Sequence, residues 1–286
     1  MCMNVGLIYK FYLPIYGGTE TLMYTIAKGL LKYGVNVQII TTRFSKNLPQ
    51  EEVYNGVMVH RLDLYNILFG QVDILKLSTY SKLKKIIKDL DIVDIFSSTP
   101  SQLLIKSIYI ARRLNKTIIW HPIFLPGRFK LNRKLILRFF GSLWDNIFVE
   151  KFALSANSIV THTSIEAKYF SEIINRHNVH IPLYMLGECI EEVNIGKRRI
   201  MKALNKYGLT VYNYILSVGR ITWYKGYDLL IDAWNLLEKE FPGLKLVIVG
   251  SDWGYKKSLL LRVKKYGIKN IIFLDSIPFK DLHALY

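Results

Sequence analysis

YILSVGRITWYKGYDLLIDAWNLLEKEFPGLKLVIVG, residues 214–250, is the stretch that decides the fold. It begins with an apolar run at 214–218 that predicts a buried strand. After a glycine and a short loop, residues 228–240 show the apolar spacing of an amphipathic helix. A second apolar run at 245–249 predicts another strand. Because a strand, a helix and a strand in this order form a parallel pair with a crossover helix, the stretch predicts an α/β domain.

The same alternation runs through the rest of the chain. Before residue 214, apolar periodicity predicts strands at 5–9, 35–41, 57–62, 92–96, 117–120 and 158–161, and helices at 19–33, 74–88 and 101–113. Gly34 is placed to end the first helix as a left-handed cap, and Ser164 is the cap candidate of a further helix. A repeated strand and helix predicts parallel sheets with helices on both faces.

Length and apolar content predict two domains. The chain has 286 residues, of which 51% are hydrophobic, enough for a sizeable core and most simply interpreted as two domains. We place the first domain at residues 1–185 and the second at 186–286. After residue 250 the pattern continues with a helix at 255–266, a strand at 271–274 and the start of a helix at 280. Since a doubly wound half-sheet normally has more than three strands, we expect the second domain to be incomplete, with an exposed edge and low stability in isolation.

Charge narrows the expected partners. Lys and Arg number 39 against 22 Asp and Glu, a formal net charge of +17. This excess favours ligands that carry phosphate or an anionic membrane surface, although a generally basic proteome gives the same excess. Arg128 to Arg138 alternates cations with apolar residues, a pattern suited either to an anionic membrane or to a solvated helix packed on the sheet. No nucleic-acid module is recognised, so nucleic acid is not an expected partner.

The cysteines and the N-terminal sequence indicate the cellular compartment in which the protein is expected. Cys2 and Cys189 are too few for a disulfide framework or a zinc cluster. No apolar run approaches the ~20 residues of a membrane span, and no signal cleavage site follows the N-terminus. We expect a cytoplasmic protein, and we leave open a peripheral attachment to the inner membrane face.

Ligands of open α/β sheets bind at the carboxyl ends of the strands, so the loops there are the candidate sites. After residue 218, Gly219 is followed by Arg220 and Lys225, five residues apart. Arg220 offers a planar fork of donors and Lys225 a mobile point charge, close to a helix N-terminus. The pair predicts a diphosphate site, against the alternative of two solvated surface charges. Loops after the next two strands give candidates for the nucleotide side: Gly250, Ser276 and Ile277.

Two loops of the first domain carry further candidates. Gly17 and Gly18 allow close backbone approach to a ligand before a helix N-terminus, although turns use paired glycines freely. Glu20 has the plain explanation of an acidic residue in a first helical turn. His121 ends a strand, where its ring is placed either to hydrogen-bond a reacting hydroxyl or leaving oxygen, or to serve the structure alone. The other five histidines have no comparable setting.

These residues resemble the family 4 glycosyltransferases of the GT-B fold, which are retaining and use nucleotide sugars. GGTETLMYTIAKGLLKYGVNVQIITT, residues 17–42, is similar to the family's opening glycine loop, first helix and second strand. Residues 214–250 are similar to the start of its donor-binding domain, and the quite specific signature is Gly219-Arg220 with Lys225-Gly226. ANSIVTHTSIEAKYF, residues 156–170, is similar to the segment leading out of the acceptor domain. The resemblance covers nearly the whole chain.

The resemblance implies two Rossmann-like domains facing each other across a cleft, the first for the acceptor and the second for the nucleotide sugar. Arg220 and Lys225 match the pair that holds the donor diphosphate, and Gly17 and Gly18 match the loop that covers it. His121 matches the histidine near the sugar and the acceptor. The implied reaction moves a hexosyl unit from a nucleotide diphosphate sugar to a glycan or lipid-linked acceptor, with retention, no cofactor and no obligatory metal.

The sequence departs from the family pattern in three places. The hinge near Gly187 matches only loosely, and Asp275 stands where a glycine is frequent. The family's paired-glutamate motif, expected after residue 274, is absent. We therefore expect a C-terminally truncated product, a fragment or a degenerate copy. Two other interpretations stay open: an inactive chain that binds sugar nucleotide or a partner chain, and a sugar-nucleotide epimerase on the same two-domain plan.

Overall fold

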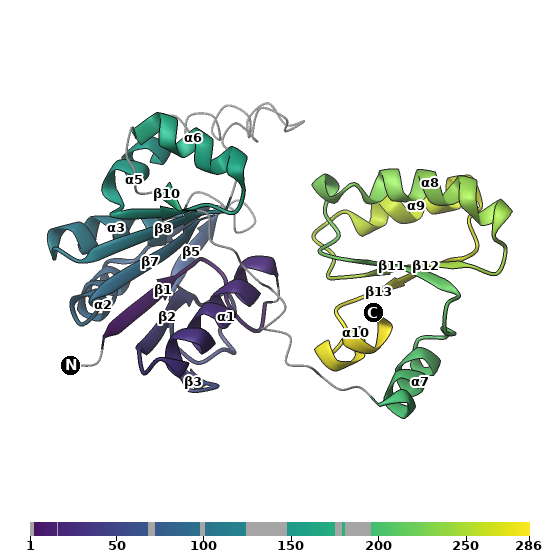
Figure 1. The fold of residues 1–286 in the computed structure, drawn as a ribbon, viewed down its shortest axis with the longest axis horizontal. Coiled ribbons are helices and arrows are strands. Elements are labelled where there is room, and N and C mark those ends of the chain that lie inside the picture. Colours follow the sequence, from purple (N-terminus) through teal and green to yellow (C-terminus); the bar gives the residue numbers. More distant parts are fainter. Residues whose placement is uncertain are drawn as a thin grey trace. The chain divides into compact units, whose positions relative to one another are not determined.

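The computed structural model describes residues 3–15, 17–67, 72–97, 101–123, 148–174, 179–180 and 196–286. The chain divides into two compact units, Met1–Met185 and Leu186–Tyr286. Each unit has a sheet with helices on both faces, parallel in the second unit and parallel except for one antiparallel edge strand in the first (Figure 1). The α/β class predicted from the sequence is therefore confirmed. The basic stretch from Arg128 to Arg138 and the hinge near Gly187 lie outside the described residues.

The first unit is built on a sheet with the strand order β10-β9-β8-β7-β1-β2-β4-β3. The central strand β1 (Asn4–Ile8) pairs in parallel with β2 (Asn36–Thr42) and with β7 (Ile92–Ser97). The other strands are β3 (Glu51–Tyr54), β4 (Val57–Leu62), β8 (Thr117–Pro122), β9 (Ser158–Val160) and β10 (Val179–His180). Because β1, β7 and β8 run in parallel, their carboxyl ends share one edge of the sheet.

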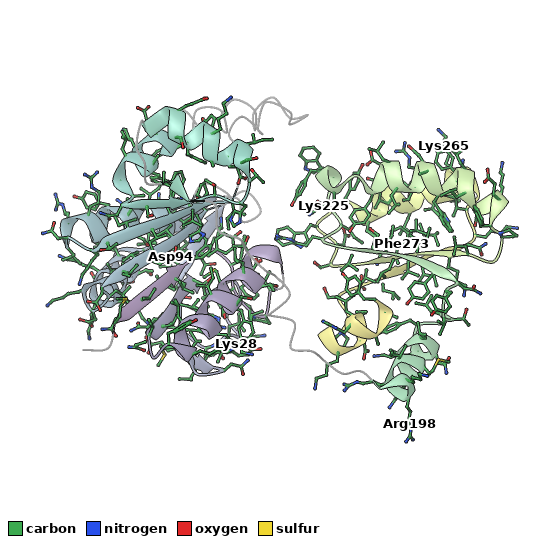
Figure 2. All side chains as sticks on the ribbon, in the orientation of Figure 1. Lys28, Asp94, Arg198, Lys225, Lys265 and Phe273 are labelled. Atoms are coloured by element: carbon green, nitrogen blue, oxygen red, sulfur yellow. The ribbon has the colours of Figure 1, made fainter. Side chains whose placement is uncertain are left out.

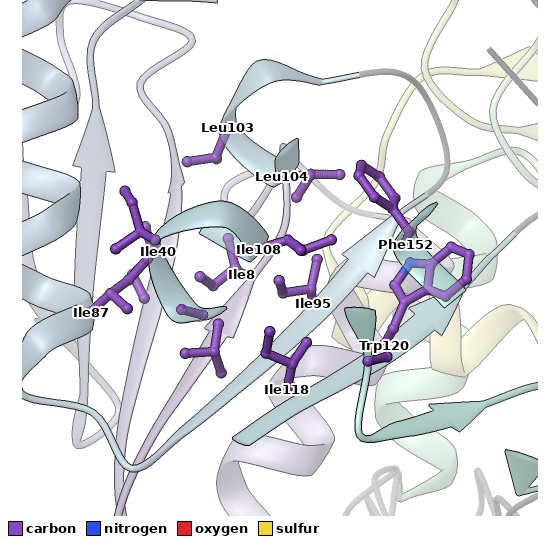
Figure 3. Close-up of a cluster of buried hydrophobic side chains, with 14 of the residues drawn as sticks. Ile8, Ile40, Ile87, Ile95, Leu103, Leu104, Ile108, Ile118, Trp120 and Phe152 are labelled. Carbon is purple, nitrogen blue, oxygen red and sulfur yellow. The ribbon is translucent and has the colours of Figure 1, made fainter. Parts of the chain in front are cut away.

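Alternating side chains give this sheet two apolar faces. One face, with Leu7 and Ile39, carries the core that packs against α1 (Gly18–Lys32). The other face, with Ile8 and Ile95, carries a larger core that includes Trp120 (Figure 3). The helices that contribute to this larger core are α2 (Leu77–Lys88), α3 (Gln102–Arg113), α5 (Glu150–Ser155) and α6 (Ser164–Ile174). Burial on both faces explains why the central strands read as continuous apolar runs.

The predicted helix at 74–88 begins too early. Strand β6 (Val72–Leu75) pairs in antiparallel fashion with β5 (Leu64–Ile67), so the helix starts only at Leu77. A short apolar run fits a strand as well as the first turn of a helix, and here pairing decides. Strand β3 was not predicted; it is an edge strand that is antiparallel to β4 and begins with two glutamates.

The predicted helix caps have different outcomes. Gly34 has φ +73°, and its N–H donates to the carbonyl of Leu31 at 3.0 Å, so the left-handed end of α1 is confirmed. The cap predicted at Ser164 is wrong by one residue. Thr163 Oγ1 accepts from the N–H of Glu166 at 3.2 Å, and the Glu166 carboxylate accepts from the N–H of Thr163 at 3.1 Å. This reciprocal pair is a capping box, so Thr163 is the cap.

The second unit has a parallel sheet in the order β11-β12-β13. Its strands are β11 (Tyr214–Val218), β12 (Lys245–Val249) and β13 (Ile271–Leu274). Helices α8 (Tyr227–Glu240) and α9 (Lys256–Tyr266) cover one face, and α7 (Lys197–Lys206) and α10 (Phe279–Leu285) cover the other (Figure 1). Four of the five residues of β12 are buried, whereas β11 and β13 are partly exposed, so β12 is the centre of this unit.

Each face of this sheet has a small core of its own. Trp234 and Ile248 belong to the core under α8 and α9, and Leu204 and Val247 belong to the core under α7 and α10. In the part of the chain that the structure describes, no helix combines the length and the apolar character needed to cross a bilayer.

Candidate functional site

The loop after β11 is joined to the loop after β12 beyond the ends of the two strands. The N–H of Gly219 donates to the carbonyl of Val249 at 2.9 Å, and the N–H of Ile221 donates to that of Ser251 at 2.9 Å. The N–H of Trp253 returns to the carbonyl of Ile221 at 3.1 Å. This pairing fixes the start of the loop that carries the predicted diphosphate-binding residues.

A contact between two glycines makes this pairing possible. Gly250 has φ +158°, and a Cβ built on it would lie 1.9 Å from the carbonyl oxygen of Gly219. The same oxygen accepts a hydrogen bond from the Tyr227 hydroxyl at 2.8 Å. Burial raises the pKa of Tyr227, in keeping with a protonated phenol that donates this hydrogen bond. The structure therefore gives Gly219 and Gly250 a definite local role, which is close backbone packing.

Arg220 and Lys225 both follow this fixed point. The guanidinium of Arg220 stacks on the indole of Trp253, 4.9 Å from the ring centroid. Lys225 ends the short 3₁₀ helix η4 (Trp223–Lys225) and is exposed (Figure 2). Gly226 then turns the chain into α8 with φ +73°. Neither Arg220 nor Lys225 forms an ion pair with a carboxylate of the described residues. Two uncompensated cations thus follow the carboxyl end of β11.

The nucleotide-side candidates have mixed surroundings. Ser276 is exposed, but the Ile277 side chain packs into the core under α7 and α10. Asp252, which the sequence did not single out, accepts hydrogen bonds from the N–H groups of Gly254, Tyr255 and Lys256 at 2.9, 3.0 and 3.0 Å. The bond from Lys256 does most to hold the pKa of Asp252 below its usual range. Asp252 therefore accepts the first backbone N–H of α9, that of Lys256, and gives the loop after β12 a fixed shape.

In the first unit, Gly17 and Gly18 stand at the open N-terminus of α1. Gly17 is the N-cap with an extended backbone and no side-chain cap. A Cβ on Gly18 would meet nothing within 4 Å. The preceding loop is anchored from β2 and β4: Thr42 Oγ1 donates to the carbonyl of Lys10 at 2.6 Å, and the buried Arg61 donates to that of Leu13 at 2.9 Å. At Gly18 there is therefore room for a ligand to come close to the backbone. That the sugar-nucleotide donor binds there stays a prediction.

His121 is buried at the carboxyl end of β8. Its Nε2 lies 3.0 Å from Oδ1 of Asp94 in β7, close enough for an ion pair but without the alignment of a linear hydrogen bond. The ring stacks on Phe96 with centroids 4.2 Å apart. His162 is also close, with its ring centroid 6.3 Å away, so the expectation that no other histidine has a comparable setting is wrong for His162. Burial, and then the charge of His121, lowers the pKa of His162.

Asp94 is the functional candidate that the sequence analysis missed. It stands in the middle of the apolar strand β7, where a charged side chain is costly unless it has a partner. The parallel register of β7 and β8 places Phe96 opposite His121, and Asp94 lies two residues earlier on the same face. The signal available in the sequence was a lone acid inside a buried apolar strand. Figure 2 labels Asp94 within the sheet of the first unit.

The candidate residues of the two units are suited to two different kinds of chemistry. The loop after β11 offers positive charge and guanidinium donors to an anion, as a diphosphate requires. The His121–Asp94 pair holds an imidazole beside a buried acid, as positioning of a reacting hydroxyl requires. Among the described residues, no cluster of three or more His, Cys, Asp or Glu side chains is arranged to hold a metal ion.

Solved structures share this fold. A crystal structure of Anabaena Alr3699/HepE in complex with UDP and glucose matches with a TM-score of 0.72 at 15% identity, over 99% of this chain and 71% of that one. WaaG, a glycosyltransferase involved in lipopolysaccharide biosynthesis, matches with a TM-score of 0.65 at 16% identity, over 97% of this chain and 72% of that one. These likenesses support the GT-B fold.

Curated relatives are named as glycosyltransferases. An uncharacterized glycosyltransferase of Haemophilus influenzae is 25% identical over 82% of this chain and 58% of its own length. The amylovoran biosynthesis glycosyltransferase AmsD of Erwinia amylovora is 31% identical over 46% of this chain and 34% of its own. The O-antigen chain mannosyltransferase C of Escherichia coli is 21% identical over 99% of this chain and 70% of its own. The chain thus spans about 58% of the length of the first of these relatives.

Two family descriptions match consecutive parts of the chain. "Glycosyl transferases group 1" matches residues 201–286, which contain the loop with Arg220 and Lys225. "Glycosyltransferase Family 4" matches residues 16–181, which contain Gly17, Gly18 and His121 and make up more than half of the chain. The chain therefore belongs to glycosyltransferase family 4.

Proposed function

We propose that this protein takes part in a retaining transfer of a hexosyl unit from a nucleotide diphosphate sugar to a glycan or lipid-linked acceptor. The observation that carries the proposal is the loop after β11. It is fixed by the Gly219–Gly250 contact, and it carries two cations that no described carboxylate neutralises. Such a loop suits the binding and release of a ligand that carries two or more negative charges.

Arg220 and Lys225 are proposed to hold the donor diphosphate. As the bond between the sugar and the diphosphate breaks, negative charge grows on the leaving oxygen, and preorganised cations stabilise that charge. Loss of one such contact typically costs about 3 kcal/mol of transition-state stabilisation. The two cations would supply the charge neutralisation that a metal supplies elsewhere, so we propose turnover without an obligatory metal.

His121 is proposed to act on the sugar and acceptor side. Its burial and its contact with Asp94 restrict the ring to one orientation, which suits a group that must hydrogen-bond one particular hydroxyl. The relatives bear on the acceptor only in general terms: one is named for O-antigen chains and another for amylovoran biosynthesis. A polysaccharide or lipid-linked saccharide is accordingly the acceptor class that we propose.

Product analysis tests the proposal. The purified chain is incubated with a panel of UDP- and GDP-sugars and with glycan or lipid-linked acceptors, with and without EDTA. We expect a glycosylated acceptor that keeps the anomeric configuration of the donor, in both conditions, and loss of product with Arg220→Gln. An inverted product, or a reaction that EDTA stops, would contradict the mechanism.

The same assay separates the two other interpretations. An epimerase converts the sugar nucleotide without any acceptor, whereas a binding-only chain binds nucleotide and forms no product. One of the solved structures with this fold is a UDP-N-acetylglucosamine 2-epimerase from Rickettsia bellii, with a TM-score of 0.59 at 13% identity. A likeness of this degree bears on the fold alone, so transfer remains the proposed reaction.

A membrane surface is a further proposed partner. The support is the alternation of cations and apolar residues from Arg128 to Arg138, a stretch outside the described residues. Co-sedimentation with vesicles tests it. We expect binding to vesicles with anionic lipid at low salt, and no binding under those conditions would end the idea.

A further inference from the structure

Trp253 lies against the candidate phosphate-binding arginine in the second unit. The guanidinium carbon of Arg220 is 4.9 Å from the centroid of its indole ring. We propose that Trp253 is a positioning residue that holds the Arg220 guanidinium in place for the donor diphosphate. The inference rests on the proposed role of Arg220 and adds a residue to that site.

The ring of Trp253 is fixed by bonds of its own. The backbone N–H donates to the carbonyl of Ile221 at 3.1 Å, and the indole Nε1–H donates to Ser251 Oγ at 3.2 Å. On one side Asp252 is tied to three N–H groups at the start of α9, and on the other Gly254 turns the chain with φ +87°. The loop therefore places the indole without help from a ligand.

The register between the two loops brings the pair together. Ile221 forms an isolated parallel bridge with Asp252. In this parallel register Arg220 lies opposite Ser251 and Trp253 lies opposite Thr222, so the two residues form a diagonal pair on the paired segments, a spacing that long and aromatic side chains can span. The stacking of Arg220 on Trp253 follows from this pairing.

Stacking leaves the arginine able to bind an anion. A guanidinium that lies over an aromatic ring contacts the ring with its flat face. The five N–H donors lie in the plane of the guanidinium, so they stay available for an anion. A carboxylate partner would instead occupy those donors and cancel the charge. Arg220 has no such partner among the described residues. The indole thus restrains a long side chain, and so lowers the entropy lost on binding, without neutralising it.

A double-mutant cycle tests the inference. The full chain is titrated by calorimetry with UDP and with GDP, and the tighter ligand is used for Trp253→Leu, Trp253→Phe, Arg220→Gln and the double variant Arg220→Gln/Trp253→Leu. We expect Trp253→Leu to weaken binding about three- to tenfold, within the range of a partly desolvated cation–π contact. Trp253→Phe keeps an aromatic face and should recover most of the affinity. In the Arg220→Gln background, Trp253→Leu should change nothing further.

The controls keep the outcomes apart. Phe241→Leu removes another half-exposed aromatic side chain, at the end of α8, and should leave binding unchanged. Inorganic pyrophosphate, as a competitor without a base, should show the same dependence on Trp253 as the nucleotide. If Trp253→Leu weakens binding equally in the Arg220→Gln background, the ring contacts the ligand itself and the inference is wrong. If Arg220→Gln weakens binding and Trp253→Leu does not, the inference alone fails. If Arg220→Gln binds like the wild type, the proposed diphosphate site fails and the inference with it.

Discussion

The candidate side chains of the two units differ in burial and in their charged partners. In the first unit, His121 is buried, lies 3.0 Å from a carboxylate oxygen of Asp94 and is stacked on Phe96. In the second, Arg220 rests on a neutral ring, and Lys225 is exposed without a carboxylate partner among the described residues. The enclosure of His121 beside Asp94 suits the hydroxyl-orienting role that we propose for it. The restraint of Arg220 without a carboxylate suits the anion-binding role that we propose for it.

The two units also hold their loops by different means. The loop after β11 is held by backbone pairing with the loop after β12 and by the Gly219–Gly250 contact. The loop before α1 has a backbone bond as well, from the N–H of Thr42 to the carbonyl of Lys10 at 3.2 Å, but it is held in addition by the side chains of Arg61 and Thr42, which donate to its carbonyls. We therefore expect a single added methyl group to disrupt the loop after β11. We expect changes of side-chain chemistry to disrupt the loop before α1.

Gly250→Ala should have the largest effect. The new Cβ would lie 1.9 Å from the carbonyl oxygen of Gly219, at φ +158°. Something must shift, and we expect the second unit to lose on the order of 3 kcal/mol of stability or more. Chemical denaturation of the full chain measures this loss. Gly243→Ala is the matched control, because its Cβ would meet nothing within 4 Å. Equal stability of the two variants would contradict the close glycine contact.

Asp94→Asn tests the enclosed pair of the first unit. The amide keeps the size of the side chain and removes the charge beside His121, so the ring loses its electrostatic restraint. We expect the turnover number to fall roughly tenfold to hundredfold, with little change in the KM for the donor. Asp91→Asn is the control, since Asp91 is exposed and accepts from the N–H of Asn4 at 2.8 Å. An equal loss in both variants would mean that Asp94 supports only the fold.

Asp252→Ala should have the smallest effect, and the effect should depend on pH. Loss of its hydrogen bonds to the N–H groups at the start of α9 costs about 1 kcal/mol near neutral pH. Because hydrogen bonds from the backbone lower the pKa of folded Asp252, its stabilisation is present above the unfolded pKa and fades as the pH falls through the folded value. The difference in unfolding free energy between variant and wild type should therefore shrink towards acidic pH. A difference that stays constant between neutral pH and pH ~3 would contradict a stabilising role of the Asp252 carboxylate.

Much of the fold follows from the sequence because both sheets are buried on two faces. Apolar runs such as 245–249 are typical of central strands in a parallel sheet, and β12 is the buried centre of its unit. The hairpin β5–β6 and the edge strand β3 were not predicted, since pairing with a neighbour defines them and their own composition does not. The cap at Thr163 differs from the prediction by one residue, because either of two adjacent hydroxyls fits the pattern and only the bond to Glu166 decides.

The candidate site was predictable where chemistry is local in sequence. Arg220 and Lys225 stand in one loop, and His121 ends a strand, so each could be named from its neighbours. Trp253 could not be named in this way, and for Asp94 the neighbours gave only the signal of a lone acid in an apolar strand, without its partner. Asp94 gains its meaning from the register of β7 with β8, and Trp253 gains its meaning from the bridge between Ile221 and Asp252. Partners that are joined only through the sheet become visible with the structure.

Nucleotide binding by charge variants tests the central claim most directly. The full chain is titrated with UDP and GDP, and the tighter ligand is then compared across Arg220→Gln, Lys225→Gln and His121→Asn. We predict that each of the first two variants raises the Kd about tenfold or more, because hydrogen bonds to charged groups contribute about 1.5–3 kcal/mol. His121→Asn should bind within about twofold of the wild type. Unchanged binding in both charge variants would contradict the account, because the uncompensated cations after β11 would then receive no diphosphate.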